Sequence, residues 1–342
     1  MPDTSSTVTL QERFSAAFGV WDEVRPYLPL IVDELEMRLV VAMDGRTISS
    51  EEAAALLGLA PRAAADLLQR SYKRCVLNRK IENGVPGYTS ADLYARLDQF
   101  AKYENWDDIP ATERQIIDLR FLAEFVARHR SGIEHRIRGL DAETSAGPLP
   151  NEDVLLLSEV EAMLDAATHI VVQPCDCRRL GQHCGRPVET CLALDGVALE
   201  VLDRGHGRRL TGKEAKKLVR QADRKGLMHT ADAGWRANGL HTICNCCACD
   251  CYPFRAALAL GSKGVWPRSR YVAAHDRERC HFCGACVRRC QFGAFYHDGT
   301  RLPVAGHPDV SANVLLDAAR CWGCGLCANA CPSGAITMQP LP

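Results

Sequence analysis

The sequence predicts a multidomain α+β protein, with a mostly helical N-terminal domain, a cysteine-rich middle domain and a C-terminal domain carrying two repeated cysteine motifs. Three observations predict this class. Helical apolar spacing dominates residues 1–140, a stretch rich in Pro and Gly follows at 141–150, and seventeen of the eighteen cysteines lie between Cys175 and Cys331. We therefore expect domains at 1–140, 151–262 and 263–342.

The N-terminal domain is expected to consist of short helices joined by tight turns. In chain order, the expected helices are Val24–Val41, Glu51–Leu57, Pro61 to about Arg74, Ala91–Tyr103 and Thr112 to about His129. Ser49 or Ser50 is suited to cap the second helix, and Pro61 is suited to the first position of the third. Thr112 and Gln115 form a capping box for the last helix.

A β-ribbon is expected between the third and fourth helices. Cys75–Ile81 has strand character, an Asn-Gly turn follows at Asn83, and Gly87–Thr89 forms a short return. Two helices and a ribbon in this order resemble a winged helix-turn-helix.

Six basic side chains could serve DNA binding in such a unit: Arg62, Arg70, Lys73, Arg74, Arg79 and Lys80. However, residues 1–140 carry 18 Lys or Arg against 21 Asp or Glu, so this region is net acidic. The acidic balance favours an interaction or dimerisation module, and nucleic-acid binding stays the alternative.

In the middle domain, three elements are expected around the cysteines. Apolar spacing predicts a helix over about Glu152–Ala167, a short strand over His169–Val172 and an amphipathic helix over Thr211–Lys225 that ends at Gly226.

The C-terminal motifs share the spacing C-x2-C-x2-C-x3-C. The first consists of Cys280, Cys283, Cys286 and Cys290, and the second of Cys321, Cys324, Cys327 and Cys331. With this spacing, residues from about 272 to 342 resemble the bacterial two-cluster ferredoxins. A closed zinc site needs four ligands and gives no reason for such a repeated pattern of eight.

The resemblance implies two [4Fe-4S] clusters with exchanged fourth ligands. One cluster would take Cys280, Cys283, Cys286 and Cys331, and the other Cys321, Cys324, Cys327 and Cys290. The sequence departs from the family at two places. Gln291 stands where proline usually follows the fourth cysteine, and the stretch containing His297 to Pro308 is long and is expected to add a loop.

Nine further cysteines form two blocks in the middle domain and are candidate metal ligands: Cys175, Cys177, Cys184, Cys191, Cys244, Cys246, Cys247, Cys249 and Cys251. They cluster with polar residues, unlike buried cysteines that act as small apolar side chains. They could form one four-thiolate site, or two with one cysteine left over. We expect one or two additional [4Fe-4S] clusters, with zinc as the alternative.

The second block is expected to serve two sites at once. If it is extended, Cys244 and Cys246 face one way, and Cys247, Cys249 and Cys251 face the other. His169, His183 and His281 lie beside cysteine motifs and are expected to be neighbours of the metal sites rather than ligands.

These motifs favour an iron–sulfur electron-transfer protein that passes single electrons through two C-terminal clusters, and a further middle-domain cluster, to or from a partner oxidoreductase. Two alternatives remain: a reductive enzyme whose active site is a middle-domain cluster, and a redox-sensing winged-helix transcription regulator. The sequence contains no dinucleotide-binding, P-loop or HExxH motif.

A cytoplasmic location without membrane insertion is expected. The first residues lack the features of a signal peptide, and thiols in a reducing compartment usually bind metal or do redox chemistry.

Overall fold

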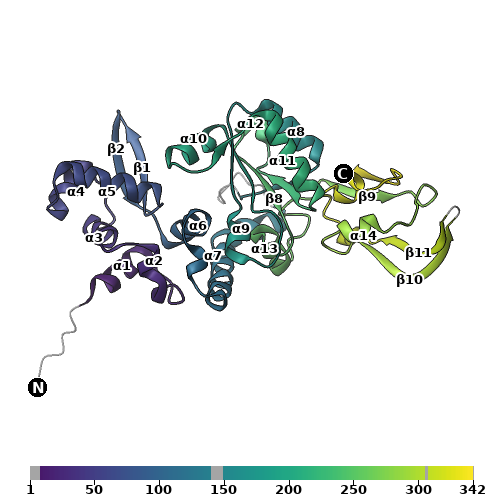
Figure 1. Ribbon diagram of the computed structural model, residues 1–342, viewed down its shortest axis with the longest axis horizontal. Helices are drawn as coiled ribbons and strands as arrows, with labels where there is room; N and C mark the ends of the chain where they lie inside the picture. The colour runs from purple at the N-terminus through teal and green to yellow at the C-terminus, as the bar shows by residue number, and fades with distance from the viewer. Residues whose placement is uncertain (1–7, 140–148, 305–306, 342) are drawn as a thin grey trace, which may run out of the picture. The chain divides into compact units, whose positions relative to one another are not determined.

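The computed structural model describes residues 8–139, 149–304 and 307–341. It is a mixed helix and sheet protein that divides into two compact units (Figure 1). Unit 1 comprises Met1–Glu124, Arg179–Gly181 and Asp203–His206, and unit 2 comprises Phe125–Arg178, Gln182–Leu202 and Gly207–Pro342. The cysteine blocks and both C-terminal motifs belong to unit 2. The expected Pro/Gly linker lies mostly outside the described residues.

Unit 1 consists of short helices and a hairpin, as expected from the sequence, except that the helix expected over Val24–Val41 is interrupted. Its helices are α1 (Leu10–Phe18), α2 (Leu28–Ile31), α3 (Glu34–Met43), α4 (Ser50–Leu57), α5 (Pro61–Lys73) and α6 (Leu93–Tyr103), and its hairpin is β1 (Leu77–Glu82) and β2 (Val85–Ser90). Ser49 and Glu52 form a capping box at α4, and Pro61 begins α5. Helix α7 (Ala111–Ile137) runs from unit 1 into unit 2 and is longer than expected.

The prediction of one continuous helix over Val24–Val41 is wrong in the middle of this range. A 3-10 turn at Arg25–Tyr27 and the short helix α2 precede a break at Val32 and Asp33, where the backbone is extended. The Asp33 carboxylate accepts a hydrogen bond from the backbone N–H of Glu36 and thereby caps α3. A carboxylate at this position stabilises a new helix start, which a continuous apolar pattern does not reveal.

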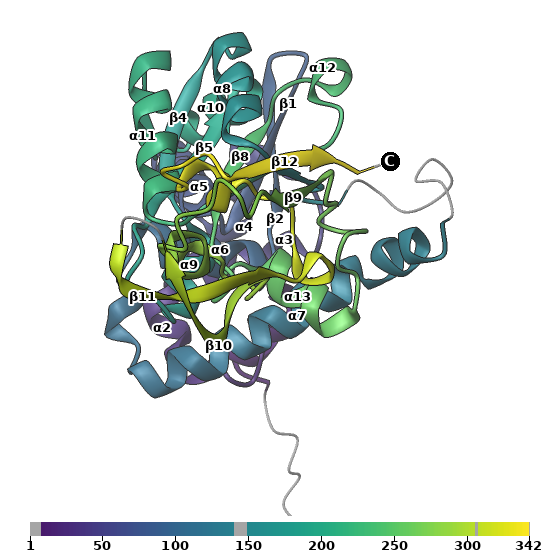
Figure 2. The same cartoon turned by 90° about the vertical axis from the view of Figure 1, so that its right-hand side faces the viewer.

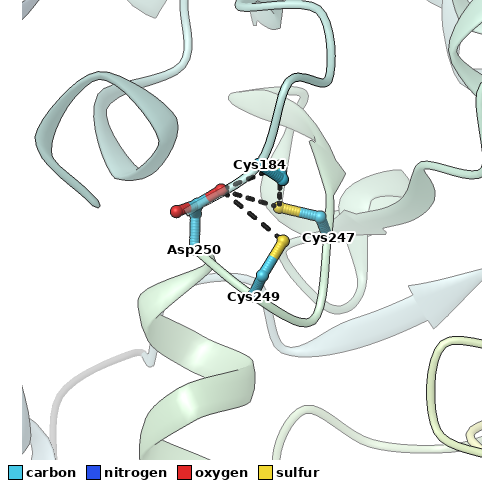
Figure 3. A group of neighbouring side chains, drawn as sticks. All are labelled: Cys184, Cys247, Cys249 and Asp250. Atoms are coloured by element: carbon cyan, nitrogen blue, oxygen red, sulfur yellow. Dashed lines mark hydrogen bonds between the residues drawn. The ribbon is translucent and has the colours of Figure 1, made fainter. Parts of the chain in front are cut away.

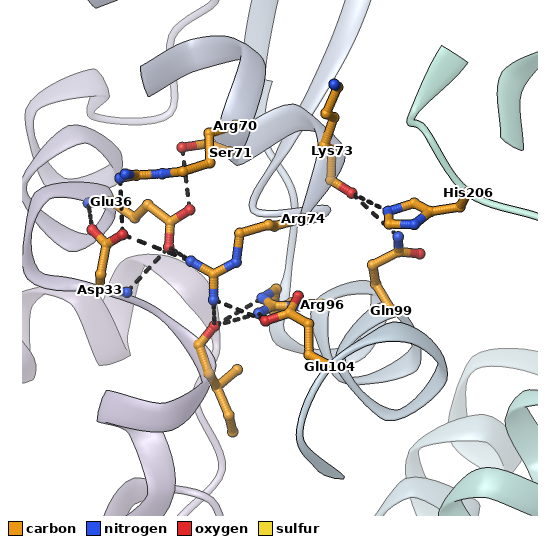
Figure 4. Close-up of polar contacts among 11 residues, drawn as sticks. Asp33, Glu36, Arg70, Ser71, Lys73, Arg74, Arg96, Gln99, Glu104 and His206 are labelled. Atoms are coloured by element: carbon orange, nitrogen blue, oxygen red, sulfur yellow. Dashed lines mark hydrogen bonds and ion pairs between the residues drawn. The ribbon is translucent and has the colours of Figure 1, made fainter. Parts of the chain in front are cut away.

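Carboxylates within unit 1 already pair with several of the basic side chains considered for DNA (Figure 4). Arg70 contacts Asp33 at 2.8 Å, and Arg74 contacts Glu36 at 2.6 Å and Glu104 at 3.1 Å.

The hairpin arginine and lysine are paired as well. Arg79 pairs with Asp203 and lies over the Tyr72 ring, and Lys80 pairs with Glu82 at 2.6 Å. These pairings favour packing over phosphate binding, and the resemblance to a winged helix stays a prediction.

Unit 2 is built on a six-stranded antiparallel sheet with strand order β3-β7-β8-β5-β4-β6. Its strands are β3 (Asp153–Leu155), β4 (Ile170–Pro174), β5 (Glu189–Leu194), β6 (Arg208–Arg209), β7 (Met228–Ala231) and β8 (Thr242–Cys246). The helix expected over Glu152–Ala167 is wrong in its first turn, because Asp153–Leu155 pairs with β7 before helix α8 (Leu157–Ala166) begins. This pairing is a long-range contact that overrides local propensity.

Alternation along the strands separates an apolar face from a face that carries thiols. Leu192, Leu194 and Ile243 belong to the apolar core together with side chains of α8 and α11 (Gly212–Arg224). Cys191 alternates with Leu192 on β5, and Cys244 and Cys246 flank Asn245 on β8, so these cysteines point to the opposite face. The remaining helices are α9 (Asp176–Gly181), α10 (Asp195–Asp203), α12 (Trp235–Asn238) and α13 (Tyr252–Leu260).

The C-terminal region repeats a strand, a cysteine loop, a short helix and a strand. The first copy is β9 (Tyr271–His275), α14 (Ala285–Arg289) and β10 (Phe295–Val304), and the second is β11 (His307–Leu316), α15 (Leu326–Asn329) and β12 (Ile336–Pro340). Strand β9 pairs with β12, and β10 pairs with β11 (Figure 2). The long stretch between the motifs therefore forms a β-ribbon rather than the expected loop.

No helix within the described part of the chain has both the length and the apolar character needed to cross a membrane.

Candidate metal centres

One C-terminal cavity is lined by four thiols from two distant segments. Cys280, Cys283 and Cys286 come from the first motif, and Cys331 comes from the second. The backbone N–H of Phe282 donates to Cys280 Sγ at 3.3 Å. Burial raises the pKa of Cys286 to about 11. A metal must therefore displace the proton from this thiol when it binds.

The second cavity mirrors the first. Cys321, Cys324 and Cys327 line it together with Cys290 from the other motif. Backbone N–H groups again point at sulfur, from Ala294 to Cys290 at 3.1 Å and from Gly323 to Cys321 at 3.4 Å. Burial raises the pKa of Cys324 to about 12.

Gly323 has a structural reason to be glycine. Its φ is +69°, and a Cβ there would lie 2.2 Å from the backbone oxygen of Tyr271. The second cysteine loop can therefore approach β9 closely only without a side chain at this position.

The spacing within the two motifs and the cavities that they line permit a comparison with known families. Residues 273–296 and 314–337 each match the 4Fe-4S binding domain. No curated protein and no solved structure matches the chain. The two matched domains support [4Fe-4S] clusters and an iron–sulfur electron-transfer role in general. The donor sets fit, because each cavity offers four thiols and backbone N–H groups that can hydrogen-bond to sulfur. The individual ligand roles stay predictions.

Six of the nine middle-region thiols form a closed ring upstream of the 4Fe-4S binding domains. Each thiol has two of the others as neighbours that shift its pKa, in the order Cys175, Cys177, Cys251, Cys246, Cys244, Cys191 and back to Cys175. The thiol contact with Cys175 raises the pKa of Cys177 well above its ordinary value, and burial does the same for Cys251.

Strand register and helix starts assemble this ring. Leu192 on β5 faces Ile243 on β8, so one further step of the same register places Cys191 opposite Cys244. Cys175 precedes α9 and Cys177 lies in its first turn, whereas Cys251 is the residue before α13. The ring therefore closes only when two helix starts meet two neighbouring strands.

The other three thiols converge on Asp250 (Figure 3). Cys184, Cys247, Cys249 and Asp250 offer ligand atoms that all lie within 4.8 Å of one another. The sequence expectation for the second block is thus confirmed for the separation of Cys247 and Cys249 from Cys244 and Cys246. It is wrong for Cys251, which joins the ring because the chain turns at residues 248–250.

Arg178 lies between the ring and this second group. Its side chain is 3% exposed and donates to the backbone oxygens of Pro187 at 2.9 Å and Asn245 at 2.7 Å. Burial alone would lower the pKa of Arg178, but Cys175, Cys191 and Cys247 outweigh burial and raise it. A buried guanidinium thus supplies positive charge to both thiol groups.

Gln291 connects the middle region to the second 4Fe-4S cavity. Its side-chain oxygen accepts a hydrogen bond from the backbone N–H of Ala248 at 2.8 Å, and its side-chain nitrogen donates one to the backbone oxygen of Gly226 at 2.6 Å. Ala248 lies between Cys247 and Cys249, and Gln291 directly follows Cys290. The departure from the usual proline therefore has a physical reason, since proline could make neither hydrogen bond.

Sequence reasoning missed Asp250 and Arg178 as parts of these centres. The available signal was polar residues placed inside cysteine blocks, at Cys249-Asp250-Cys251 and Cys177-Arg178. Of the three histidines, His183 contacts Asp250, and His281 lines the first cavity. The backbone N–H of His169 donates to Asp195 at 3.0 Å.

Proposed function

We propose that the protein is an electron-transfer protein with two C-terminal [4Fe-4S] clusters and a further iron–sulfur centre held by the ring of six thiols, serving a partner oxidoreductase. The observation that carries this proposal is the pair of 4Fe-4S binding domains, each with three thiols of its own around a cavity that the other domain completes. Such clusters, when bound, accept and release one electron at a time.

The spacing of the ring thiols supports an iron–sulfur centre in the ring. Ligands of one metal ion must all lie close together, and among the described residues no compact group contains three of the ring thiols. The eight thiols of the 4Fe-4S cavities, all of which the structure describes, form no compact group either. The ring therefore resembles the cluster cavities in the spread of its thiols, and its six thiolates exceed the four that a [4Fe-4S] cluster requires.

Burial suggests the order of the centres. Cys283 is exposed, so the first cavity reaches the surface where a partner can approach. The second cavity is lined by Trp322, which packs against Phe254 of α13 with ring centroids 5.0 Å apart. Phe254 lies three residues after the ring thiol Cys251. This contact supports an order in which the second cavity lies next to the ring.

Unit 1 is proposed to dock the partner rather than DNA. Its hairpin exposes Ile81 and Val85, each 61% exposed, while Arg70, Arg74 and Arg79 are occupied by carboxylates. Exposed apolar side chains suit a protein contact better than a phosphate backbone.

Stopped-flow reduction of the anaerobically purified chain tests this order. We expect a one-electron donor to reduce all centres, and a one-electron acceptor to reoxidise them fully. Cys324→Ala, which removes a ligand of the second cavity, should slow reduction of the ring centre by roughly 10-fold or more, because it removes the cluster that precedes the ring in the proposed order. Cys283→Ala should leave that rate within about twofold when the donor is a small molecule. A chain whose reduced centres keep their electrons in the presence of acceptor would contradict the function, and equal rates in the two variants would contradict the order.

A further inference from the structure

We propose that Cys184, Cys247, Cys249 and Asp250 hold a single Zn²⁺ ion, in a site that is separate from the iron–sulfur centres. This inference does not rest on the proposed function, since it would hold whatever the ring carries. It concerns four side chains that lie on two loops, one after α9 and the other between β8 and α13.

The ligand atoms all lie within 4.8 Å of one another, and three of four individual distances are close to those of a tetrahedron around one ion, the fourth being shorter. Zn–S bonds of about 2.3 Å and Zn–O bonds of about 2.0 Å require edges of about 3.8 Å between sulfurs and about 3.5 Å between sulfur and oxygen. Cys184 Sγ and Cys247 Sγ are 3.9 Å apart. Asp250 Oδ2 lies 3.0 Å from Cys184 Sγ, 3.5 Å from Cys247 Sγ and 3.6 Å from Cys249 Sγ.

The thiols of the two 4Fe-4S cavities differ from this compact group in their spacing. Ligands of a [4Fe-4S] cluster sit on different irons and are spread around the cluster, as the thiols of the two 4Fe-4S cavities are. Among the described residues, the compact set around Asp250 is the group that combines three thiols with a fourth ligand atom. Ligand atoms this close together suit a single ion better than a cluster whose ligands sit on different irons.

Neighbouring side chains orient the ligands and balance their charge. His183 contacts Asp250 Oδ1 through both its backbone N–H at 2.8 Å and its Nδ1 at 2.9 Å, which leaves Oδ2 directed at the thiols. Residues that bind a metal are typically oriented in this way by hydrogen bonds from neighbouring groups.

Two guanidinium groups reach the thiols, Arg186 at 3.7 Å from Cys249 Sγ and Arg178 at 3.9 Å from Cys247 Sγ. Three thiolates and a carboxylate carry four negative charges, of which a divalent ion neutralises two and the arginines the other two.

The ion would fasten the loop that carries Cys184 to the loop that carries Cys247 and Cys249. The second loop also holds Ala248, the partner of Gln291, and it is flanked by the ring thiols Cys246 and Cys251. A bound ion would therefore fix the position of two ring ligands and of the contact with the second 4Fe-4S cavity. Its role is structural, because all four tetrahedral positions are taken by the protein.

Zinc analysis and zinc-edge X-ray absorption of the full chain, purified anaerobically from cells supplied with iron and zinc, test the proposal. We expect one zinc per chain with three sulfurs at about 2.3 Å and one oxygen at about 2.0 Å. Cys249→Ala should lose the zinc, and Cys75→Ala, which alters a cysteine in unit 1, should retain it. No zinc in the intact chain, or a loss of iron and sulfide in place of zinc in Cys249→Ala, would overturn the proposal.

A second variant, Asp250→Cys, tests the site even if Cys249→Ala does not fold, because it adds a sulfur ligand instead of removing one. Asp250→Cys should keep one zinc, replace the oxygen shell by a fourth sulfur and leave iron, sulfide and the EPR signals unchanged. Retention of the oxygen shell in this variant would overturn the assignment of Asp250. A failure of the electron-transfer proposal would appear in the iron and EPR readouts instead, so the two outcomes are distinguishable.

Discussion

Replacing Cys331 by alanine together with Cys280 is expected to remove no more iron than either replacement alone, although the two residues are far apart in sequence. Both thiols line the same cavity, so the second change acts on a cluster that is already lost. Cys331→Ala combined with Cys327→Ala should behave differently, although both residues lie in one motif. This pair should remove about eight irons, because it affects both cavities.

Iron and acid-labile sulfide analysis of the single and double variants measures this pattern, with Cys75→Ala as the cysteine control. If Cys331→Ala and Cys327→Ala together remove no more iron than one of them, each motif binds its own cluster and the exchange of fourth ligands is wrong.

The second large effect is expected from Arg178→Met. The variant leaves the backbone oxygens of Pro187 and Asn245 without their donor and removes the buried positive charge that faces three thiols. Breaking a buried charged contact of this kind typically costs about 3–5 kcal/mol. We therefore expect loss of metal from the middle region and a clearly lower unfolding temperature, with the 4Fe-4S cavities still loaded.

Calorimetry and metal analysis of the full chain check this expectation. Arg178→Lys should be intermediate, because lysine keeps the charge but cannot donate in the same fork. Arg209→Met, at an exposed position, should change the stability by no more than about 0.5 kcal/mol. Full metal content and an unchanged unfolding temperature in Arg178→Met would show that the guanidinium does not support the thiol groups.

The sequence predicts the two C-terminal cavities well because their ligands follow local spacing. Cys280, Cys283 and Cys286 lie on one loop, and the repeat of the motif brings the resemblance that implies Cys331 as the fourth ligand. The separation of Cys247 from Cys246 is also local, since adjacent residues in an extended segment face opposite ways.

The division of the middle thiols into six and three could not be predicted from the sequence. It depends on the register of β5 against β8, which sets Cys191 opposite Cys244, and on the turn that returns Cys251 to the ring. Asp250 becomes a partner of Cys184 only through the fold, because 66 residues separate the two in sequence. The strand β3 was missed for the same reason, since Asp153–Leu155 is a strand only through its pairing with β7.

The measurement that tests the account most directly is a metal and acid-labile sulfide inventory of the anaerobically purified chain, combined with EPR of the reduced state. Two clusters in the 4Fe-4S domains and an iron–sulfur centre in the ring predict at least about twelve irons, a comparable amount of sulfide and signals from more than two reduced centres. Zinc should be present as one ion per chain. Fewer than about eight irons, or iron without labile sulfide, would contradict the central claim that this is an iron–sulfur electron-transfer protein.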